Sequence, residues 1–304
     1  MRTSTASRAL ELYLSDARAR VDTVLERWGA RADGLWPAPV PAAVRYSLLS
    51  TGKRLRPTLV FAAYEAVGGT TPGVAELAAS IEVVHAYSLV HDDLPCMDND
   101  DLRRGRPTTH RAFDVRTATR AGYHMVALAA RVLAAGLEAL GLDPDRRRAI
   151  ALELYRAAGA GGMIGGQALD LEAEGRRLPM TELADVHGRK TGALIAAACV
   201  IGGLAAGATP ACGEALRAYG GDVGLAFQIY DDVLDATATS AQLGKTAGKD
   251  AVLAKSTFVT LLGVGAARAE AERLAARAVD RLRQAGLVSP TLVELAHYIV
   301  TRPN

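Results

Sequence analysis

The stretch from residue 91 to 110, HDDLPCMDNDDLRRGRPTTH, holds five aspartates within ten residues and then three arginines. Clustered carboxylates repel one another and are costly to hold together unless a cation lies among them. Clustered guanidinium groups are their complement, because they are planar, permanently charged and suited to phosphate. The stretch therefore predicts either a site for a metal ion with a phosphate-bearing substrate or a solvated, highly charged loop.

Proline shapes this stretch. Regular helical geometry would place Asp92 and Asp98 on different faces of a helix. Pro95 disfavours a regular helix through this point, so the chain can curl at the helix end and bring Asp98 back beside Asp92. His85 lies seven residues before Asp92 and is expected on the same helix face.

A second acidic motif, QIYDDVLD, occupies residues 228–235. Asp231 and Asp235 are four residues apart, so both project from one face of a helix, and Gln228 shares that face. Polar groups on a mainly apolar helix need partners if they are buried. The apolar neighbours on both sides weaken the alternative of a solvated helix face.

Two other metal sites fit the first motif less well. An EF-hand counted from Asp98 would have Arg103 at its glycine position and Thr109 at its bidentate glutamate. A metal phosphohydrolase with an HD pair at His91–Asp92 would need further histidine ligands, and it leaves the second acidic motif unexplained.

The rest of the chain favours helices. Half of the residues are hydrophobic and few are aromatic, a mixture that, with abundant alanine, favours helix over strand. No segment alternates with period two between hairpin turns, and no linker-like composition divides the chain. We predict one all-α domain over residues 1–304, with helices at about 8–28, 41–49, 59–67, 74–93, 112–140, 145–171, 181–206, 211–236, 253–285 and 290–302.

Composition limits the partners and the compartment. The net charge is +2, from 35 basic and 33 acidic residues, which does not favour nucleic acid or an anionic membrane as a partner. Three scattered cysteines without CxxC spacing suit a reducing cytoplasm. We expect no signal peptide and no membrane insertion, since the apolar run at 193–208 is shorter than the ~20 residues that span a bilayer.

Cations gather in three further motifs: GKRLRP (52–57, with Lys53, Arg54 and Arg56), HGRKTGAL (187–194) and LGKTAGKD (243–250). Glycine beside Lys53, Lys245 and Lys249 lets the backbone approach an anion closely. These motifs are not P-loops, because GxxxxGK[ST] is absent.

Taken in order, the motifs resemble those of the trans-isoprenyl diphosphate synthases, of the bacterial farnesyl/geranylgeranyl diphosphate synthase type. The resemblance covers nearly the whole chain, and the pair of aspartate-rich motifs is its most specific part. It rests on RYSLLSTGKRLRP (45–57), residues 82–110, GMIGGQALDL (162–171), HGRKTGALI (187–195), GLAFQIYDDVLD (224–235) and LGKTAGKD (243–250). It implies a helical bundle of isoprenoid synthase type around a central active-site cavity.

The resemblance also implies a reaction: Mg²⁺-dependent, head-to-tail condensation of isopentenyl diphosphate with an allylic diphosphate such as dimethylallyl or geranyl diphosphate. Three Mg²⁺ ions would make the allylic diphosphate a leaving group. By resemblance, the metal ligands are Asp92, Asp98, Asp231 and Asp235, with Asp93 and Asp232 acting directly or through waters.

Residue roles follow from the same resemblance. The leaving diphosphate would meet Arg103, Lys190 and Lys245, with Lys249 and Lys255 as helpers. Isopentenyl diphosphate would bind Lys53, Arg56, His85 and Arg104, with Arg302 near the C-terminus. The allylic cation would meet the dipoles of Thr191 and Gln228 and the ring of Phe227.

Product length is expected to depend on the residues one turn before Asp92. Tyr87 is bulky and Ser88 is small, and in similar enzymes an aromatic residue there goes with short products. We predict farnesyl diphosphate, with geranylgeranyl diphosphate as the alternative, and the family suggests a homodimer.

Residues 113–130, FDVRTATRAGYHMVALAA, depart from the family pattern. Tyr123 stands where an aspartate is usual, and Arg116 and Arg120 replace small or apolar residues. One interpretation is drift on a surface or dimer face; the other is an altered pocket or subunit contact, as in a class I terpene synthase or a regulatory subunit. Both acidic motifs are intact, which favours a catalytic prenyl-elongating enzyme.

Overall fold

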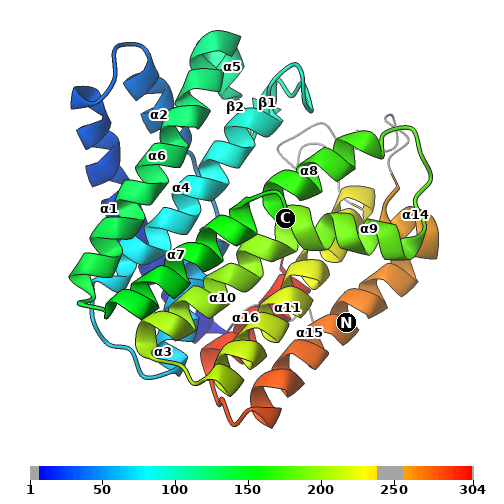
Figure 1. Cartoon of the computed structure of the whole chain (residues 1–304). Coiled ribbons are helices and arrows are strands. Elements are labelled where there is room, and N and C mark those ends of the chain that lie inside the picture. Colours follow the sequence, from blue (N-terminus) through cyan, green and yellow to red (C-terminus); the bar gives the residue numbers. More distant parts are fainter. Residues whose placement is uncertain (1–6, 238–255, 303–304) are drawn as a thin grey trace. The chain divides into compact units, whose positions relative to one another are not determined.

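The computed structural model describes residues 7–237 and 256–302. The described chain is helical apart from one short hairpin, so the predicted all-α fold class is confirmed (Figure 1). It forms two compact units. The N-terminal unit comprises Leu14–Phe61 and Thr71–Asp143, and the C-terminal unit comprises Met1–Tyr13, Ala62–Thr70 and Pro144–Asn304. A single domain over the whole chain stays a prediction.

The N-terminal unit is built around a buried helix, α4. Apolar residues occur on all of its faces, and Leu77, Ile81 and Val83 are fully buried. Helix α6 runs along α4 (Figure 1), and the contact is close because a Cβ on Gly136 would lie 2.7 Å from the Leu77 nitrogen. The helices that contribute to this unit are α1 (Arg8–Arg31), η1 (Ala32–Gly34), α2 (Val40–Leu48), α3 (Leu55–Ala66), α4 (Val74–Asp92), α5 (Thr109–Ala112) and α6 (Val115–Ala139).

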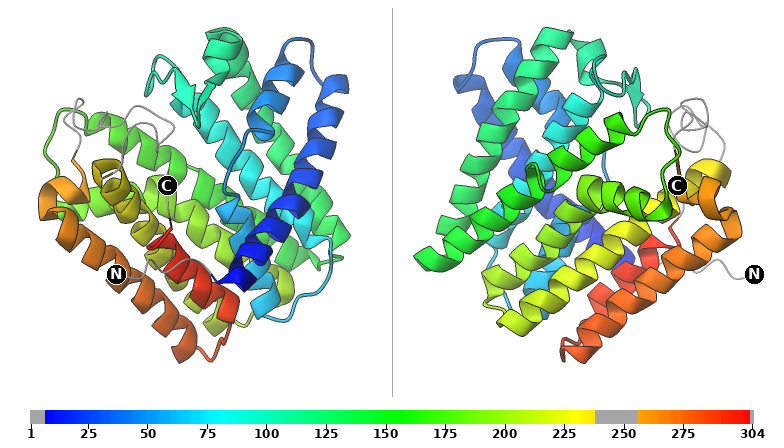
Figure 2. Two further views of the ribbon diagram at one scale, coloured as in Figure 1. Left: turned by 180° about the vertical axis from the view of Figure 1, so that it is seen from behind. Right: turned by 45° about the vertical axis from the view of Figure 1, so that its right-hand side comes forward.

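The C-terminal unit has a second buried helix, α10, which packs on α11 and α7. Helix α15 lies along α11 (Figure 2). Gly220 brings α11 close to α10, since a Cβ there would lie 2.5 Å from the Ala196 Cα. Its helices are α7 (Pro144–Ala158), α8 (Met163–Glu172), α9 (Met180–His187), η2 (Gly188–Gly192), α10 (Ala193–Ala206), α11 (Pro210–Thr237), α14 (Phe258–Leu262), α15 (Val264–Gln284) and α16 (Pro290–Ile299).

Glycine residues and a π-helix interrupt several of the predicted helices. The predicted helix at 145–171 is divided into α7 and α8 by GAGG at residues 159–162, because each helical glycine costs about 1 kcal/mol relative to alanine. The predicted helix at 181–206 contains η2, which is a π-helix. Together α9, η2 and α10 form an apolar segment, Met180–Ala206, that is long enough to cross a membrane by length and composition. However, 61% of its most apolar window is buried inside the protein, as expected of a core helix.

The sequence pattern did not predict a hairpin. Strands β1 (Leu102–Arg103) and β2 (Arg106–Pro107) pair in antiparallel register. The turn between them is Arg104–Gly105, with φ of 54° and 74°. Two successive left-handed residues are typical of a type I′ turn, and strands of two residues are too short to show an alternating pattern.

Candidate active site

The first acidic motif curls back on itself, as predicted from Pro95. Helix α4 ends at Asp92. The backbone N–H of Asp98 donates to the Asp92 carbonyl at 2.8 Å, and that of Asp100 donates to the Asp93 carbonyl at 3.3 Å. The third aspartate of the motif therefore returns to the end of α4, which confirms the predicted path of the backbone.

Asp93 and Arg103 form a two-pronged ion pair. The Arg103 Nη2 and Nε donate to the Asp93 Oδ1 at 2.6 and 2.8 Å. Burial raises the pKa of Asp93 and outweighs the opposing effect of Arg103. A guanidinium carries five N–H donors, so Arg103 can hold Asp93 and still face a diphosphate.

Positive charge gathers beside the motif within the N-terminal unit. Arg104 donates from Nη1 to the Thr51 carbonyl at 2.6 Å, across Gly52, where a Cβ would lie 2.6 Å from that nitrogen. Burial, and then the charges of Arg56 and Arg104, hold the pKa of His85 well below its usual range. His85 is therefore a neutral imidazole among cations, and this cluster suits a diphosphate.

Arg54 behaves differently from its neighbours in GKRLRP. It is 5% exposed and is bonded to Asp22 and Glu82 at 2.9 Å each. Reading the motif as three equivalent cations missed this, because the acidic partners lie 32 and 28 residues away in the sequence.

In the C-terminal unit, η2 holds two predicted residues. Thr191 donates to the Gln228 Oε1 at 3.1 Å, so these two predicted residues meet. Lys190 is paired with Asp170 at 2.7 Å. Asp170 was not predicted, although it stands in the family motif GMIGGQALDL.

Gly166 allows α8 to pack directly against η2. A Cβ on Gly166 would lie 2.2 Å from the Lys190 backbone nitrogen, so α8 touches η2 directly. Gln167, the next residue, is buried, and among the described residues neither its amide oxygen nor its nitrogen has a hydrogen-bond partner. A buried amide of this kind calls for a water or a ligand, and Gln167 too was missed from the sequence.

The second acidic motif is held by a buried arginine. Arg302 donates from Nη2 to the Asp231 Oδ1 at 2.5 Å and lies 4.2 Å from the centroid of the Phe227 ring. The structure therefore groups Arg302 with the second acidic motif. Asp232 accepts the N–H of Phe258 at 2.9 Å and so supports the start of α14.

The donor set suits Mg²⁺ that arrives with its substrate. Over residues 7–237 and 256–302, no group of three His, Cys, Asp or Glu side chains could hold a metal ion alone. Mg²⁺ is commonly bound by one or two carboxylates together with substrate phosphates and waters. Asp92 and Asp98 in the N-terminal unit and Asp231 and Asp235 in the C-terminal unit can supply such carboxylates.

Tyr87 is linked to the unusual helix α6. Its buried ring makes an edge contact with His91, and His91 makes a second one with Tyr123. The His91 Nε2 also lies 3.1 Å from the Thr119 carbonyl oxygen. Ser88 donates to the His85 carbonyl at 2.9 Å. The His91 imidazole therefore lies between Tyr123 and the predicted chain-length residue Tyr87.

Three predicted residues cannot be placed. Lys245, Lys249 and Lys255, with the motif LGKTAGKD, lie outside the described residues, and their roles stay predictions.

Comparisons with known proteins agree with the motifs. A model of the polyprenyl synthetase family matches residues 38–289. The chain is 44% identical over 272 residues to the farnesyl diphosphate synthase of Escherichia coli K12, covering 87% of this chain and 89% of that one. It is 42% identical over 276 residues to geranylgeranyl pyrophosphate synthase 12, chloroplastic, of Arabidopsis thaliana, covering 88% and 75%.

A solved structure gives the same result for the fold. The geranyltransferase from Helicobacter pylori complexed with magnesium and isoprenyl diphosphate superposes with a TM-score of 0.81 at 32% identity, covering 98% of both chains. This agreement confirms the predicted isoprenoid synthase type of fold. The chain therefore belongs to the polyprenyl synthetase family and is a short-chain prenyltransferase, a polyprenyl diphosphate synthase.

Proposed function

We propose that the enzyme condenses isopentenyl diphosphate with dimethylallyl and geranyl diphosphate and stops at farnesyl diphosphate. The observation that carries the product assignment is Tyr87, a bulky side chain buried on α4 five residues before Asp92. Geranylgeranyl diphosphate is the second candidate, because the relatives include both farnesyl and geranylgeranyl synthases.

The side chains have distinct tasks in this proposal. Arg56, Arg104 and neutral His85 bind the diphosphate of isopentenyl diphosphate, together with Lys53. Asp92, Asp98, Asp231 and Asp235 would hold three Mg²⁺ ions, which would supply charge that stabilises the departing diphosphate of the allylic substrate.

Proton and electron movements need no protein base. The allylic C–O bond breaks and its electron pair leaves with diphosphate, for which Lys190 and Arg103 would be ligands. The dipoles of Thr191 and Gln228, already joined at 3.1 Å, stabilise the allylic cation. The isopentenyl double bond attacks that cation to form the new C–C bond, and the departing diphosphate accepts the proton that is lost.

Product sizing tests this proposal. Purified enzyme with Mg²⁺, dimethylallyl diphosphate and labelled isopentenyl diphosphate is expected to give a fifteen-carbon product. Tyr87→Ala is expected to lengthen it, and Tyr87→Phe, which keeps the ring, should not. A twenty-carbon product from the native enzyme would support the geranylgeranyl alternative. Failure to incorporate isopentenyl diphosphate with any allylic primer would overturn the proposal in both forms.

We also propose a cytoplasmic homodimer, with the outward face of α6 at the subunit contact. Val115, Tyr123 and Val126 are exposed apolar residues spaced by eight and three positions, so they share one helix face. Tyr123 is the most exposed of the three, with 66% of its surface accessible to solvent. Light scattering after size exclusion should show a dimer that Tyr123→Asp dissociates, whereas Leu12→Asp on α1 should not. A native monomer would contradict the proposal.

A further inference from the structure

Arg54 stands between two proposed ligands of isopentenyl diphosphate, Lys53 and Arg56, yet it is withdrawn from solvent. Its backbone has a φ of 48°, in the left-handed region that is unfavourable for residues other than glycine. An arginine held both buried and in this conformation indicates that its surroundings fix it firmly.

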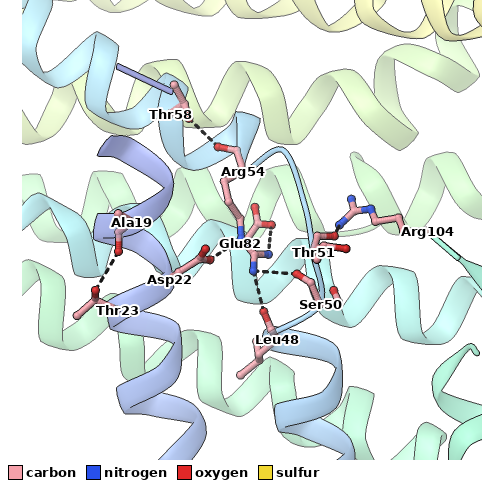
Figure 3. A network of polar contacts seen from close by, with 10 residues as sticks. All are labelled: Ala19, Asp22, Thr23, Leu48, Ser50, Thr51, Arg54, Thr58, Glu82 and Arg104. Atoms are coloured by element: carbon pink, nitrogen blue, oxygen red, sulfur yellow. Dashed lines mark hydrogen bonds and ion pairs between the residues drawn. The ribbon is translucent and has the colours of Figure 1, made fainter. Parts of the chain in front are cut away.

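The guanidinium of Arg54 joins three helices and a loop (Figure 3). Its Nε donates to Asp22 on α1 and its Nη1 donates to Glu82 on α4, each at 2.9 Å. Its Nη2 donates to the carbonyl oxygens of Leu48 and Ser50, both at 3.0 Å, at the end of α2 and in the loop that follows. Four acceptors in different directions suit the planar, five-donor guanidinium and not the single ammonium of a lysine.

The Arg54 backbone also fixes the start of α3. Its carbonyl oxygen accepts the N–H of Thr58 at 3.0 Å and the Thr58 hydroxyl at 2.8 Å. Arg56 lies in this first turn of α3. Glu82, the buried partner of Arg54, stands three residues before His85 on α4, so one ion pair ties the turn that carries Arg56 to the turn that carries His85.

The loop beside Arg54 also touches Arg104. A Cβ on Gly52 would lie 2.6 Å from the Arg104 Nη1 and 3.5 Å from the Arg54 Nη1, and Arg104 donates to the Thr51 carbonyl. The loop thus runs between the buried guanidinium of Arg54 and that of Arg104, a proposed ligand of isopentenyl diphosphate.

We propose that Arg54 is a positioning residue: held by Glu82 and Asp22, it sets the loop and the start of α3 so that Lys53, Arg56, His85 and Arg104 converge on isopentenyl diphosphate. Two carboxylates compensate its charge, so Arg54 does not itself bind the substrate. This inference rests on the proposed function of the same site.

Steady-state kinetics with both substrates tests the positioning role of Arg54. Arg54→Lys and Glu82→Gln are expected to raise the KM for isopentenyl diphosphate about tenfold, as for the loss of one charge-assisted hydrogen bond. The KM for the allylic diphosphate should change less than about twofold. Asp22→Asn should give a smaller rise in the same KM, because the Asp22 carboxylate is 36% exposed.

Arg27→Lys is the matched control. Arg27 and Glu76 pair the same two helices, α1 and α4, at a site where the Arg27 side chain is 48% exposed, so both KM values should stay at their native level. An equal rise in both KM values, or no rise, would overturn the positioning role. If Arg54→Lys does not fold, the KM values of Glu82→Gln and Asp22→Asn for the two substrates test the positioning role instead. A native enzyme that does not incorporate isopentenyl diphosphate contradicts the proposed function instead.

Discussion

Arg54, Arg103 and Arg104 carry the same charge but differ in what compensates it. Arg54 has two carboxylate partners, and Arg103 has the buried carboxylate of Asp93. Arg104 is hydrogen-bonded to a backbone carbonyl, and its pKa is lowered, by burial first and then by Arg103 and Arg54, against the attraction of Glu82. Arg104 therefore has no carboxylate partner among the described residues, which supports its proposed role as a ligand of isopentenyl diphosphate.

Asp93→Asn tests the Arg103 pair. Removing the buried carboxylate takes away the closest charged partner of Arg103 and leaves only the longer contact with Asp100 at 3.9 Å, so the free energy of unfolding is expected to fall by about 2 kcal/mol. Activity should fall too, because Arg103 is no longer oriented. Denaturant unfolding and product formation measure the two effects. Asp101→Asn is the control: Asp101 pairs with Arg111 on the surface, so it should change stability by less than about 1 kcal/mol. Equal losses in the two variants would contradict the assignment.

The lowered pKa of His85 predicts that the stability of the fold depends on pH. Its pKa in the folded protein lies well below 6.5, because of burial and nearby arginines, so below pH 6.5 the unfolded chain binds a proton that the folded chain does not. Stability therefore rises with pH in this window and is lost on acidification. His85→Gln should reduce the acid-induced loss by up to about 1 kcal/mol per pH unit below 6.5. Thermal melts from pH 7.5 to 5.5 measure it. The exposed His297→Gln should leave the slope unchanged, and an unchanged slope in His85→Gln would refute the prediction.

Residue types alone predicted the charged groups of the candidate site, but they did not predict which of these groups form ion pairs with one another. Asp92, Asp98 and the basic motifs were recognised from local composition and from one proline. The partners Asp22, Glu82 and Asp170 were not, because each meets its cation at least 20 residues away in sequence. Nothing in the spacing distinguishes an arginine that binds a substrate from one that is neutralised in the core.

Close helix contacts decide the geometry of the individual elements. Gly166 sets α8 on η2, and Gly224 sets α11 on the same π-helix, where a Cβ would lie 2.7 Å from the Gly192 Cα. In both places the neighbour is backbone, which cannot rotate away as a side chain can.

Gly166→Ala is expected to displace η2. Its Cβ would lie 2.2 Å from the Lys190 nitrogen, so we expect a loss of about 1–3 kcal/mol of stability from overpacking and a fall in kcat, because Lys190 moves. Gly213→Ala on α11 meets nothing within 4 Å and should be neutral or stabilising by less than about 1 kcal/mol. Melting curves and kcat are measured for both; full activity in Gly166→Ala would contradict a role for this contact.

Apolar periodicity predicted nearly every helix, but it did not predict how they are interrupted. The GAGG break after α7, the π-helix and the Arg104–Gly105 turn each involve five residues or fewer. Apolar periodicity is read over a window of about 11 residues or more, so such short features do not change it. Gly263, with a φ of 81°, separates α14 from α15 in the same way.

We expect Mg²⁺ to be needed for catalysis and not for folding. No group of metal-binding side chains joins elements together within the described ranges 7–237 and 256–302. Chelation with EDTA is therefore expected to abolish product formation while the melting temperature and the helical circular dichroism stay unchanged, and excess Mg²⁺ should restore activity. A chelator that melts the fold would show that a metal also supports the structure.

The π-helix η2 has a consequence for engineering this enzyme. A π turn holds one residue more than an α turn, so α9 and α10 are rotationally out of phase by about 100°. Deleting one residue within 188–192 would convert the π turn into an ordinary α turn, and the residues left in the turn would take new positions relative to α8 and α11. Lys190 could not then keep Asp170 while Thr191 keeps Gln228. Chimeras with relatives should therefore be joined at Gly207, where α10 ends in a left-handed residue, and not inside this turn.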